Sequence, residues 1–367
     1  MKNQRLVYMD VIRVFACICI TTIHFNATVD GYNISGQFLY NNQFIPNTYF
    51  GRIYLGEIGN CLFFMLSGAG LQYAARRRKR KMPYFSFIWK RAKAIYPGYW
   101  VAMALAFSYD IVFSHWVNGG SIWQLLLNVA GLDVYPYLRG WISATPFYQL
   151  GEWFLGCLLI CYLFWPLIDL GLSKKPIATL VGISAIMLIW LWKKPQDSTS
   201  VVVRLTQMSI GAVMIQCDMP RKSWKLLLFA IGLFTVTVLY KKYVDEVIID
   251  TVFCWALYVT ITYIVELFPV FFNELGAFFE KAGALTYPIF LVHHKAISVI
   301  CNNTFDLANL PRRFVVVLYV AYWLITILLA LLVQKLSKMF VKSIEFVWSA
   351  VRLQWSAHRM CIITMKE

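Results

Sequence analysis

Three ionisable residues lie in the first apolar segment of the chain, which runs from Tyr8 to Phe25. Asp10 and Arg13 are three residues apart, a spacing that allows an ion pair on one face of a helix. Arg13 and His24 are eleven residues apart, so eleven helical steps of about 100° bring them within about 20° of each other around the helix. The spacing predicts one face that carries both groups, with their Cα atoms about 16 Å apart along the axis.

This shared face could bind an anionic cosubstrate at one end and carry out acid–base chemistry on a hydroxyl group at the other. Ionisable groups in a membrane span are costly and usually face a polar interior. A guanidinium at one end could bind an anionic cosubstrate, and His24 further along could act as a general base on a hydroxyl group. The alternative is a structural Asp10–Arg13 pair together with a histidine at the membrane interface. Three ionisable groups near one face favour the catalytic interpretation.

Polar residues in two other apolar segments could line the same site. Asn60 and Ser67 are seven residues apart in "NCLFFMLSGAG", so they would share a helix face. Ser67 could line a polar path, but small residues in this position also allow close helix packing. Glu152 could orient His24 or bind a sugar hydroxyl, and the alternative is a solvated carboxylate at the interface.

A late apolar segment, "ALTYPIFLVHH", supplies further imidazoles. His293 and His294 are adjacent, and adjacent helix positions point about 100° apart. We therefore expect at most one of them, His294 being our candidate, to face the site. Tyr287, two turns before His294, could share its face.

The cysteine pattern gives no reason to expect a metal. The nine cysteines are scattered, mostly in apolar runs, without a CxxC pair or a Cys/His zinc spacing. Cys157 and Cys161 are four residues apart on one expected helix, where small thiols pack as core hydrophobes. The sequence therefore predicts no metal site.

The composition is that of an integral membrane protein. Hydrophobic residues make up 60% of the chain and charged residues 14%, whereas soluble domains average about 45–50% and about 25%. The net charge of +16 is concentrated between apolar runs, and no nucleic-acid-binding motif accompanies it. The charge is better explained by membrane topology than by a nucleic-acid partner.

Hydropathy predicts an all-α bundle of ten transmembrane helices, because each span needs about 20 mostly apolar residues. The segment 121–132 is too short to span and is expected to lie on or dip into the outer face. The expected spans are 7–27, 53–74, 94–114, 148–171, 176–192, 201–217, 226–240, 248–268, 285–303 and 314–336.

The distribution of basic residues orients this bundle. The largest basic cluster, 76–93, is expected in the cytoplasm, and the connection 28–51, without Lys or Arg, outside. Ten crossings place both termini in the cytoplasm. The predicted transmembrane domain is therefore 1–336, followed by a basic amphipathic tail, 337–367, on the cytoplasmic leaflet.

Five segments, taken in order, resemble acyltransferase family 3, a family of integral membrane proteins. They cover nearly the whole chain: "MDVIRVFACICITTIHF", "NCLFFMLSGAG", "FIWKRAKAIYPGYW", "GEWFLGCLLICYLFWPL" and "ALTYPIFLVHH". The resemblance implies a ten-span enzyme of the bacterial inner membrane. Such an enzyme moves an acyl group, usually acetyl, from cytoplasmic acyl-CoA to a hydroxyl of an extracytoplasmic glycan or lipid-linked sugar.

The resemblance also assigns site residues. The family's arginine and histidine correspond to Arg13 and His24, and its basic run to Lys90 and Arg91. Many relatives have arginine before Ile-Tyr-Pro, where this chain has Ala94, so Lys93 is the substitute contact for CoA. The expected partners are acyl-CoA as donor substrate, the glycan or lipid-linked acceptor, and membrane lipid. The oligomeric state stays open, with a homodimer as one form.

Two other functions fit an ionisable face within a bundle. A transporter or flippase for a sugar or lipid could bind its substrate with an intramembrane arginine and histidine, and a scaffold would need no site at all. Transporters often show paired repeats and broken helices, and no clear pair is visible in this sequence. The acyltransferase is therefore the leading hypothesis.

Overall fold

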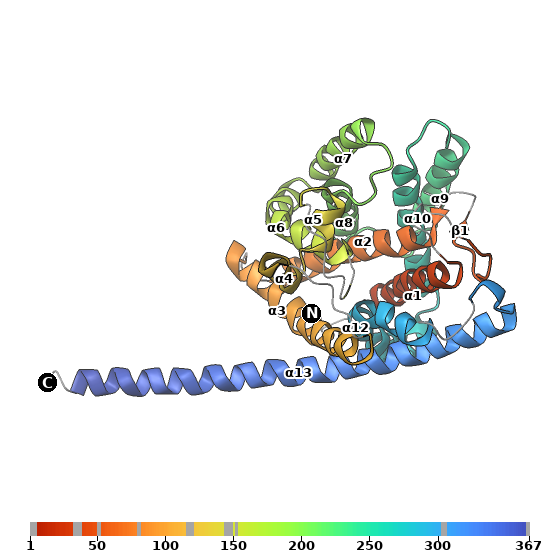
Figure 1. Ribbon diagram of the computed structural model, residues 1–367. Helices are drawn as coiled ribbons and strands as arrows, with labels where there is room; N and C mark the ends of the chain where they lie inside the picture. Colours follow the sequence, from red (N-terminus) through yellow and green to blue (C-terminus); the bar gives the residue numbers. More distant parts are fainter. Residues whose placement is uncertain are drawn as a thin grey trace.

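The computed structural model describes residues 6–31, 39–49, 53–78, 82–114, 121–142, 150, 153–301 and 307–364, and the side chains of all these except 114, 308 and 347–364. Within them the chain is almost entirely helical (Figure 1). The elements are α1 (Val7–Val29), β1 (Thr48–Tyr49), β2 (Ile53–Tyr54), α2 (Leu55–Arg76), α3 (Tyr84–Tyr109), a π-helical turn η1 (Asp110–Ser114), α4 (Ile122–Val129), α5 (Val134–Leu138), α6 (Trp153–Lys174), α7 (Pro176–Lys193), α8 (Val201–Gln216), α9 (Trp224–Leu239), α10 (Glu246–Leu267), α11 (Pro269–Glu274), α12 (Gly276–Cys301), a 3₁₀ turn η2 (Leu307–Asn309) and α13 (Arg312–Thr364).

Helix α1 lies at the centre of the bundle, packed against α2, α10 and α12. Helices α1 and α12 run in the same direction, because Asp10 lies beside Gly283 and His24 beside His294. Between these two contacts, the Cys17 thiol lies 3.9 Å from the carbonyl oxygen of Thr286. Two helices far apart in the sequence therefore lie side by side over the length of the first segment.

Glycines bring α2 and α8 into close contact. A Cβ atom on Gly68 would overlap the backbone of Met208, and one on Gly211 would overlap the backbone of Met65. Small residues at helix contacts allow this kind of backbone approach in membranes. The small-residue stretch around Ser67 therefore serves packing on at least one of its faces.

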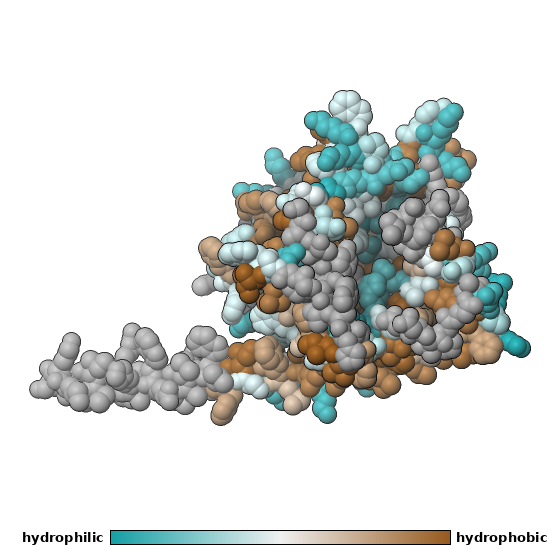
Figure 2. Space-filling model, viewed as in Figure 1, coloured by the Kyte–Doolittle hydropathy of each residue, from teal (hydrophilic) through white to brown (hydrophobic). Residues whose placement is uncertain are grey.

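The predicted apolar segments correspond to the long helices. Within the part of the chain that the structure describes, six helices are long and apolar enough to cross a membrane: α1, α6, α7, α10, α12 and the first 35 residues of α13. Helices α8 and α9 are shorter and apolar, while α2 and α3 occupy the second and third predicted spans. Figure 2 shows hydrophobic residues over much of α13 and hydrophilic ones over the ends of α7 and α9. The number of crossings and the sides of the termini stay predictions.

The segment 121–132 contains a short helix, α4, and its expected place at the outer face stays a prediction. Its last carbonyl groups accept hydrogen bonds from aromatic side chains of α3. Tyr96 donates to Ala130 at 3.0 Å and Trp100 donates to Val129 at 2.9 Å. These bonds satisfy backbone groups that a helix end leaves without partners, a requirement that is stringent within a membrane.

Helix α13 continues without a break through residue 336. It contains 53 residues, which corresponds to about 80 Å, whereas a bilayer core is about 30 Å thick. Its C-terminal part extends beyond the bundle (Figure 1). The predicted transmembrane helix and the predicted tail are thus one continuous helix.

Candidate active site

Helices α1 and α12 hold the first pair of candidate residues. Arg13 donates from Nη1 to Oδ1 of Asp10 at 2.6 Å, so the predicted pair is present. The Asp10 carboxylate is buried, whereas a third of the Arg13 side chain is exposed. A Cβ on Gly283 would lie 3.0 Å from the Asp10 Oδ1 atom and 3.5 Å from Arg13 Nη1. Glycine at this position lets α12 approach the ion pair while the guanidinium stays accessible.

The other candidate group of α1 lies in a cluster of three imidazoles. The ring centroid of His24 lies 4.3 Å from that of His294 and 5.1 Å from that of His293. The centroids of His293 and His294 are 4.3 Å apart. The expectation that only one of the adjacent histidines faces the site is wrong. The gap between the two residues, rather than one of them, faces His24, so both rings reach it.

Hydrogen bonding orients one ring of the cluster. Nδ1 of His293 lies 2.7 Å from the carbonyl oxygen of Phe290, and because a carbonyl can only accept, Nδ1 carries the hydrogen. Nε2 then carries the lone pair when the ring is neutral. His293 is fully buried, and His24 and His294 are half-buried.

An ion pair directly follows the cluster on α12. Nζ of Lys295 donates to both carboxylate oxygens of Asp110 at 2.7 Å. Asp110 begins the π-helical turn η1 at the end of α3, and π-turns are frequent at functional sites. This pair ties α3 to the turn of α12 that carries His293 and His294.

Tyr287 forms a second link between α12 and α3. Its hydroxyl donates to the carbonyl oxygen of Ile95 at 3.0 Å, and its ring packs against Gly98. Because its hydroxyl is bonded to α3, Tyr287 acts in this structure as a link between helices. A role in lining the site stays a prediction.

The basic run at the start of α3 divides into inward and outward residues. Lys90 and Lys93 are exposed, and Nζ of Lys93 lies 5.3 Å from the Trp89 ring centroid. Arg91 is half-buried and lies beside Tyr162 of α6, which also neighbours Ser67 of α2. Arg91 is thus the basic residue of the run that reaches the bundle interior.

The two remaining predicted site residues are Asn60 and Glu152. Asn60 lies on α2 and is half-buried, within the first two turns of that helix. Glu152 lies outside the described residues, which resume at Trp153, so its proposed contact with His24 stays a prediction.

A polar network covers the end of α1 beyond His24. Asn26 donates to the carbonyl of Ile45 at 2.9 Å and to the Asn47 side chain at 2.7 Å. Asp30, directly after α1, accepts from the backbone N–H of Asn42 at 2.9 Å. Burial raises the pKa of Asp30, although hydrogen bonds to its carboxylate oppose this effect. The segment 39–49 is thereby held against the end of the helix that carries the histidine.

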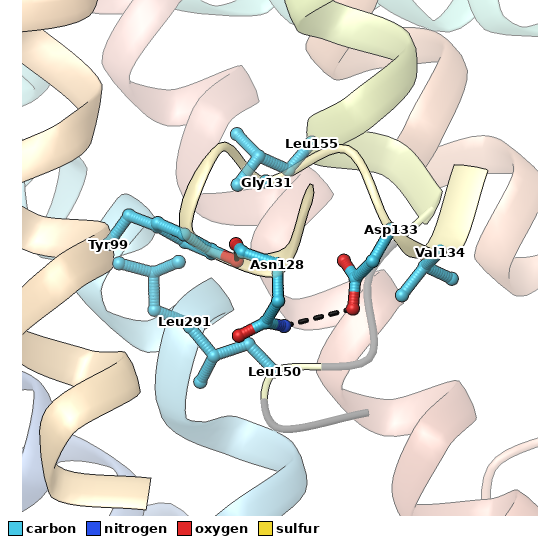
Figure 3. Close-up of a pocket in the computed structure, with 8 residues that line it drawn as sticks. All are labelled: Tyr99, Asn128, Gly131, Asp133, Val134, Leu150, Leu155 and Leu291. Carbon is cyan, nitrogen blue, oxygen red and sulfur yellow. Dashed lines mark hydrogen bonds between the residues drawn. The ribbon is translucent and has the colours of Figure 1, made fainter. Parts of the chain in front are cut away.

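A small cavity is lined by residues of α3, α4, α6 and α12 (Figure 3). Asn128 donates to Asp133 at 2.9 Å within it, and Leu291 is the contribution of α12. The space is sufficient for about one water molecule. The cavity is too small for an acyl group and is not a substrate site in this conformation.

Comparison with known proteins gives one match. The family model for the acyltransferase domain of acyltransferase family 3 matches residues 6–335, nearly the whole chain. The chain belongs to acyltransferase family 3. No curated protein and no solved structure matches it.

Family membership and the apolar helices together make this a multi-pass membrane acyltransferase. Arg13 and His24, the two residues that the family resemblance assigns to the site, lie on one continuous helix, α1. Helix α12 brings the rings of His293 and His294 beside the His24 end of this helix.

Sequence reasoning missed a second buried charge network in this family 3 chain. Arg204 of α8 is fully buried and donates to both carboxylate oxygens of Glu57 on α2, at 2.7 and 2.9 Å. The guanidinium carbon lies 5.3 Å from the Phe64 ring centroid and 5.2 Å from that of Trp153. A lone arginine within an apolar span is the signal that could have found it, because such residues need a partner.

Proposed function

We propose that the protein is an acyl-CoA-dependent O-acyltransferase of the bacterial inner membrane. It transfers an acyl group, acetyl in this proposal, from cytoplasmic acyl-CoA to a hydroxyl of an extracytoplasmic or lipid-linked glycan, such as a cell-surface polysaccharide. The observation that carries the proposal is the single face of α1 with an accessible guanidinium at Arg13 and an imidazole at His24.

The two groups divide the work between the two substrates. In the predicted orientation, Arg13 lies towards the cytoplasm, with Arg91 as a second cation for the phosphates of CoA. His24 lies three turns further out, about 16 Å along the axis. That separation is on the order of the length of a pantetheine arm, so a phosphate bound near Arg13 would leave the thioester near His24.

The transfer reaction then needs one base at His24. The imidazole accepts the proton of the acceptor hydroxyl while the hydroxyl oxygen attacks the thioester carbonyl. The C–S bond breaks as the ester forms, and the proton passes from His24 to the departing CoA thiolate. Lys295 and Asp110 hold the adjacent imidazoles of α12 in place during these steps.

Acetyl transfer by the purified protein tests the proposal. The protein in lipid nanodiscs would receive radiolabelled acetyl-CoA and lipid-linked glycan extracted from the producing strain, and labelled glycan would be measured with released CoA thiol. His24→Ala should lower transfer by about 10²–10⁴-fold, the usual effect of a positioned acid or base. CoA binding should stay near that of the wild type. His358→Ala, in the C-terminal part of α13, is the matched control.

Two outcomes would contradict parts of this assignment. If His24→Ala keeps most of its activity while Glu152→Gln loses it, the base has been misassigned. If the wild type moves a glycan across the membrane without releasing any CoA thiol, the transporter or flippase hypothesis replaces the enzyme. Acetylation of the surface glycan in a deletion strain would identify the acceptor.

A further inference from the structure

The cluster formed by His24, His293 and His294 has the composition of a transition-metal site. Each residue offers one ring nitrogen, and these nitrogens all lie within 4.8 Å of one another. Neutral imidazole is a common ligand for Zn²⁺, and three histidines with one open position form an established zinc geometry. This site has no recognisable motif in the sequence, because His24 lies about 270 residues from the other two ligands, which are adjacent to each other.

One ligand already has the outer contact that metal-bound histidines show. The Nδ1–H group of His293 donates to the Phe290 carbonyl, which fixes the ring and directs the Nε2 lone pair as the ligand. Metal-ligating histidines almost always donate their other nitrogen to a carbonyl, carboxylate or water. The fully buried histidine of the cluster is therefore oriented by the fold before any ion enters.

The spacing sets a limit on how tightly an ion would bind. Tetrahedral Zn²⁺ with Zn–N bonds of about 2.0–2.1 Å holds its ligand nitrogens about 3.4 Å apart. Nitrogens that are up to 4.8 Å apart must therefore converge by up to about 1.4 Å, through rotation of the two half-buried rings. No carboxylate belongs to this group among the described residues. The positive charge of a bound ion would therefore not be neutralised by its ligands, which is unfavourable inside a membrane bundle. Both features favour reversible binding.

We propose that His24, His293 and His294 bind one divalent transition-metal ion such as Zn²⁺, and that the bound ion inhibits acyl transfer. Inhibition follows because the ion occupies the nitrogen of His24 that would accept the hydroxyl proton. The inhibition rests on the proposed function, whereas the binding does not. This assignment replaces our expectation from the sequence that the chain has no metal site.

Metal binding is measured first, without acyl-CoA or acceptor. Purified protein, treated with EDTA and exchanged into metal-free detergent buffer, is titrated with ZnCl₂ by calorimetry. The wild type and His358→Ala should bind one Zn²⁺ per chain, and His293→Ala and His294→Ala should bind it at least about tenfold more weakly. Absence of saturable binding to the wild type would overturn the site, as would equal affinity in folded His293→Ala and His294→Ala.

A spectroscopic measurement keeps the test independent of variant folding. Co²⁺ added to the wild type should produce visible d–d absorption of a four-coordinate nitrogen site, and Zn²⁺ should remove that absorption. A spectrum of hexahydrated Co²⁺ alone would overturn the proposal. The two histidines outside the cluster, His115 and His358, cannot explain a positive result if a variant with both replaced by alanine gives the same spectrum.

Inhibition is measured last, in the acetyl-transfer assay. Stoichiometric Zn²⁺ should lower the wild-type rate at least about tenfold, and EDTA should restore it. The remaining activity of His293→Ala, whatever its level, should lose this sensitivity to zinc. Stimulation by Zn²⁺, or loss of activity on treatment with EDTA, would overturn the inhibitory role and also the role of His24 as base. Zinc binding in a protein that transfers no acyl group under any condition would refute the proposed function and leave the metal site standing.

Discussion

The Lys295 ammonium donates to both carboxylate oxygens of Asp110, with each Nζ–O distance at 2.7 Å. Lys295 directly follows the His293–His294 pair on α12, and Asp110 begins the π-turn that ends α3. The pair therefore fixes the position of the imidazoles relative to a helix that carries the basic run at its other end.

Breaking this pair should impair catalysis more than substrate binding. Asp110→Asn or Lys295→Met leaves one charge without its partner, which costs about 3–5 kcal/mol for a fully buried pair. The cost should be smaller here, because Lys295 and Asp110 keep 20% and 12% of their side chains exposed. We expect a lower thermal unfolding temperature and a reduced kcat, with little change in KM for acyl-CoA.

Exchanging the two charges tests whether the pair acts by holding α3 and α12 together. The double variant Asp110→Lys with Lys295→Asp should recover part of the lost kcat, because the bond between α3 and α12 can form again. Asp218→Asn is the control, since Asp218 is 76% exposed in its pair with Arg76 and exposed pairs contribute little. A double variant no better than the single ones would show that the pair has no positioning role.

The two neighbouring cations of the basic run should differ in their effect on CoA binding. Arg91→Ala should raise the Kd for acyl-CoA about tenfold, which matches the loss of one hydrogen bond to a charged group. Lys90→Ala should have a smaller effect, because Lys90 is exposed whereas Arg91 turns towards Tyr162. Calorimetry with a non-hydrolysable acyl-CoA analogue measures both, and equal effects would remove the distinction between them.

Alanine at the contact of α2 and α8 should prevent correct packing. Gly68→Ala and Gly211→Ala each place a methyl group on the opposing backbone, so we expect little monodisperse protein after purification. Gly70→Ala is the matched control on the same helix, because a Cβ there would meet no atom within 4 Å. That variant should be neutral or more stable by up to about 1 kcal/mol. Normal yield and melting of Gly68→Ala would contradict the observed approach.

Removing one charge from the buried pair of Glu57 and Arg204 should destabilise the protein more than removing one charge from a surface pair. Glu57→Leu alone strands a fully buried guanidinium, and loss of about 3–5 kcal/mol of stability is expected. Combining it with Arg204→Met removes both charges, and the double variant should melt at a higher temperature than Glu57→Leu. Thermal unfolding in one detergent measures this cycle, and an additive result would indicate that the charges do not interact.

A native thiol reports on the predicted orientation. Cys217, directly after α8, is the exposed cysteine among those described, and the positive-inside rule places that end of α8 in the cytoplasm. A membrane-impermeant maleimide should label it only after the cells are permeabilised, with Cys217→Ser as the control. Labelling in intact cells would reverse the orientation and separate Arg13 from cytoplasmic CoA.

The first helix could be predicted well because its information is local. Arg13 and His24 share a face through helical geometry alone, and α1 runs through both without a break. The family also followed from ordered motifs that span the chain, and the comparison confirms it. Apolar length located the helices for the same reason, since hydropathy depends only on neighbouring residues.

Contacts between distant helices could not be derived in this way. The spacing of adjacent histidines predicts an angle between them, but not the position of α1 relative to α12, which allows both His293 and His294 to reach His24. Likewise, Glu57 and Arg204 are each visible in the sequence as charges in apolar surroundings. Their pairing depends on the approach of α2 to α8, which is set by glycines 143 residues apart.

The parallel arrangement of α1 and α12 has a consequence for the order of synthesis. Cys17 and its neighbour Thr286 are 269 residues apart, so at about 5–20 residues per second α12 follows α1 by roughly 13 to 54 s. During this interval α1 has already been made, with its acid, guanidinium and imidazole, and their final neighbours do not yet exist. Helix α2 is the first partner that translation provides. The polar face of α1 must therefore be sheltered by the insertion machinery or by early pairing with α2 until nearly the whole chain has been made.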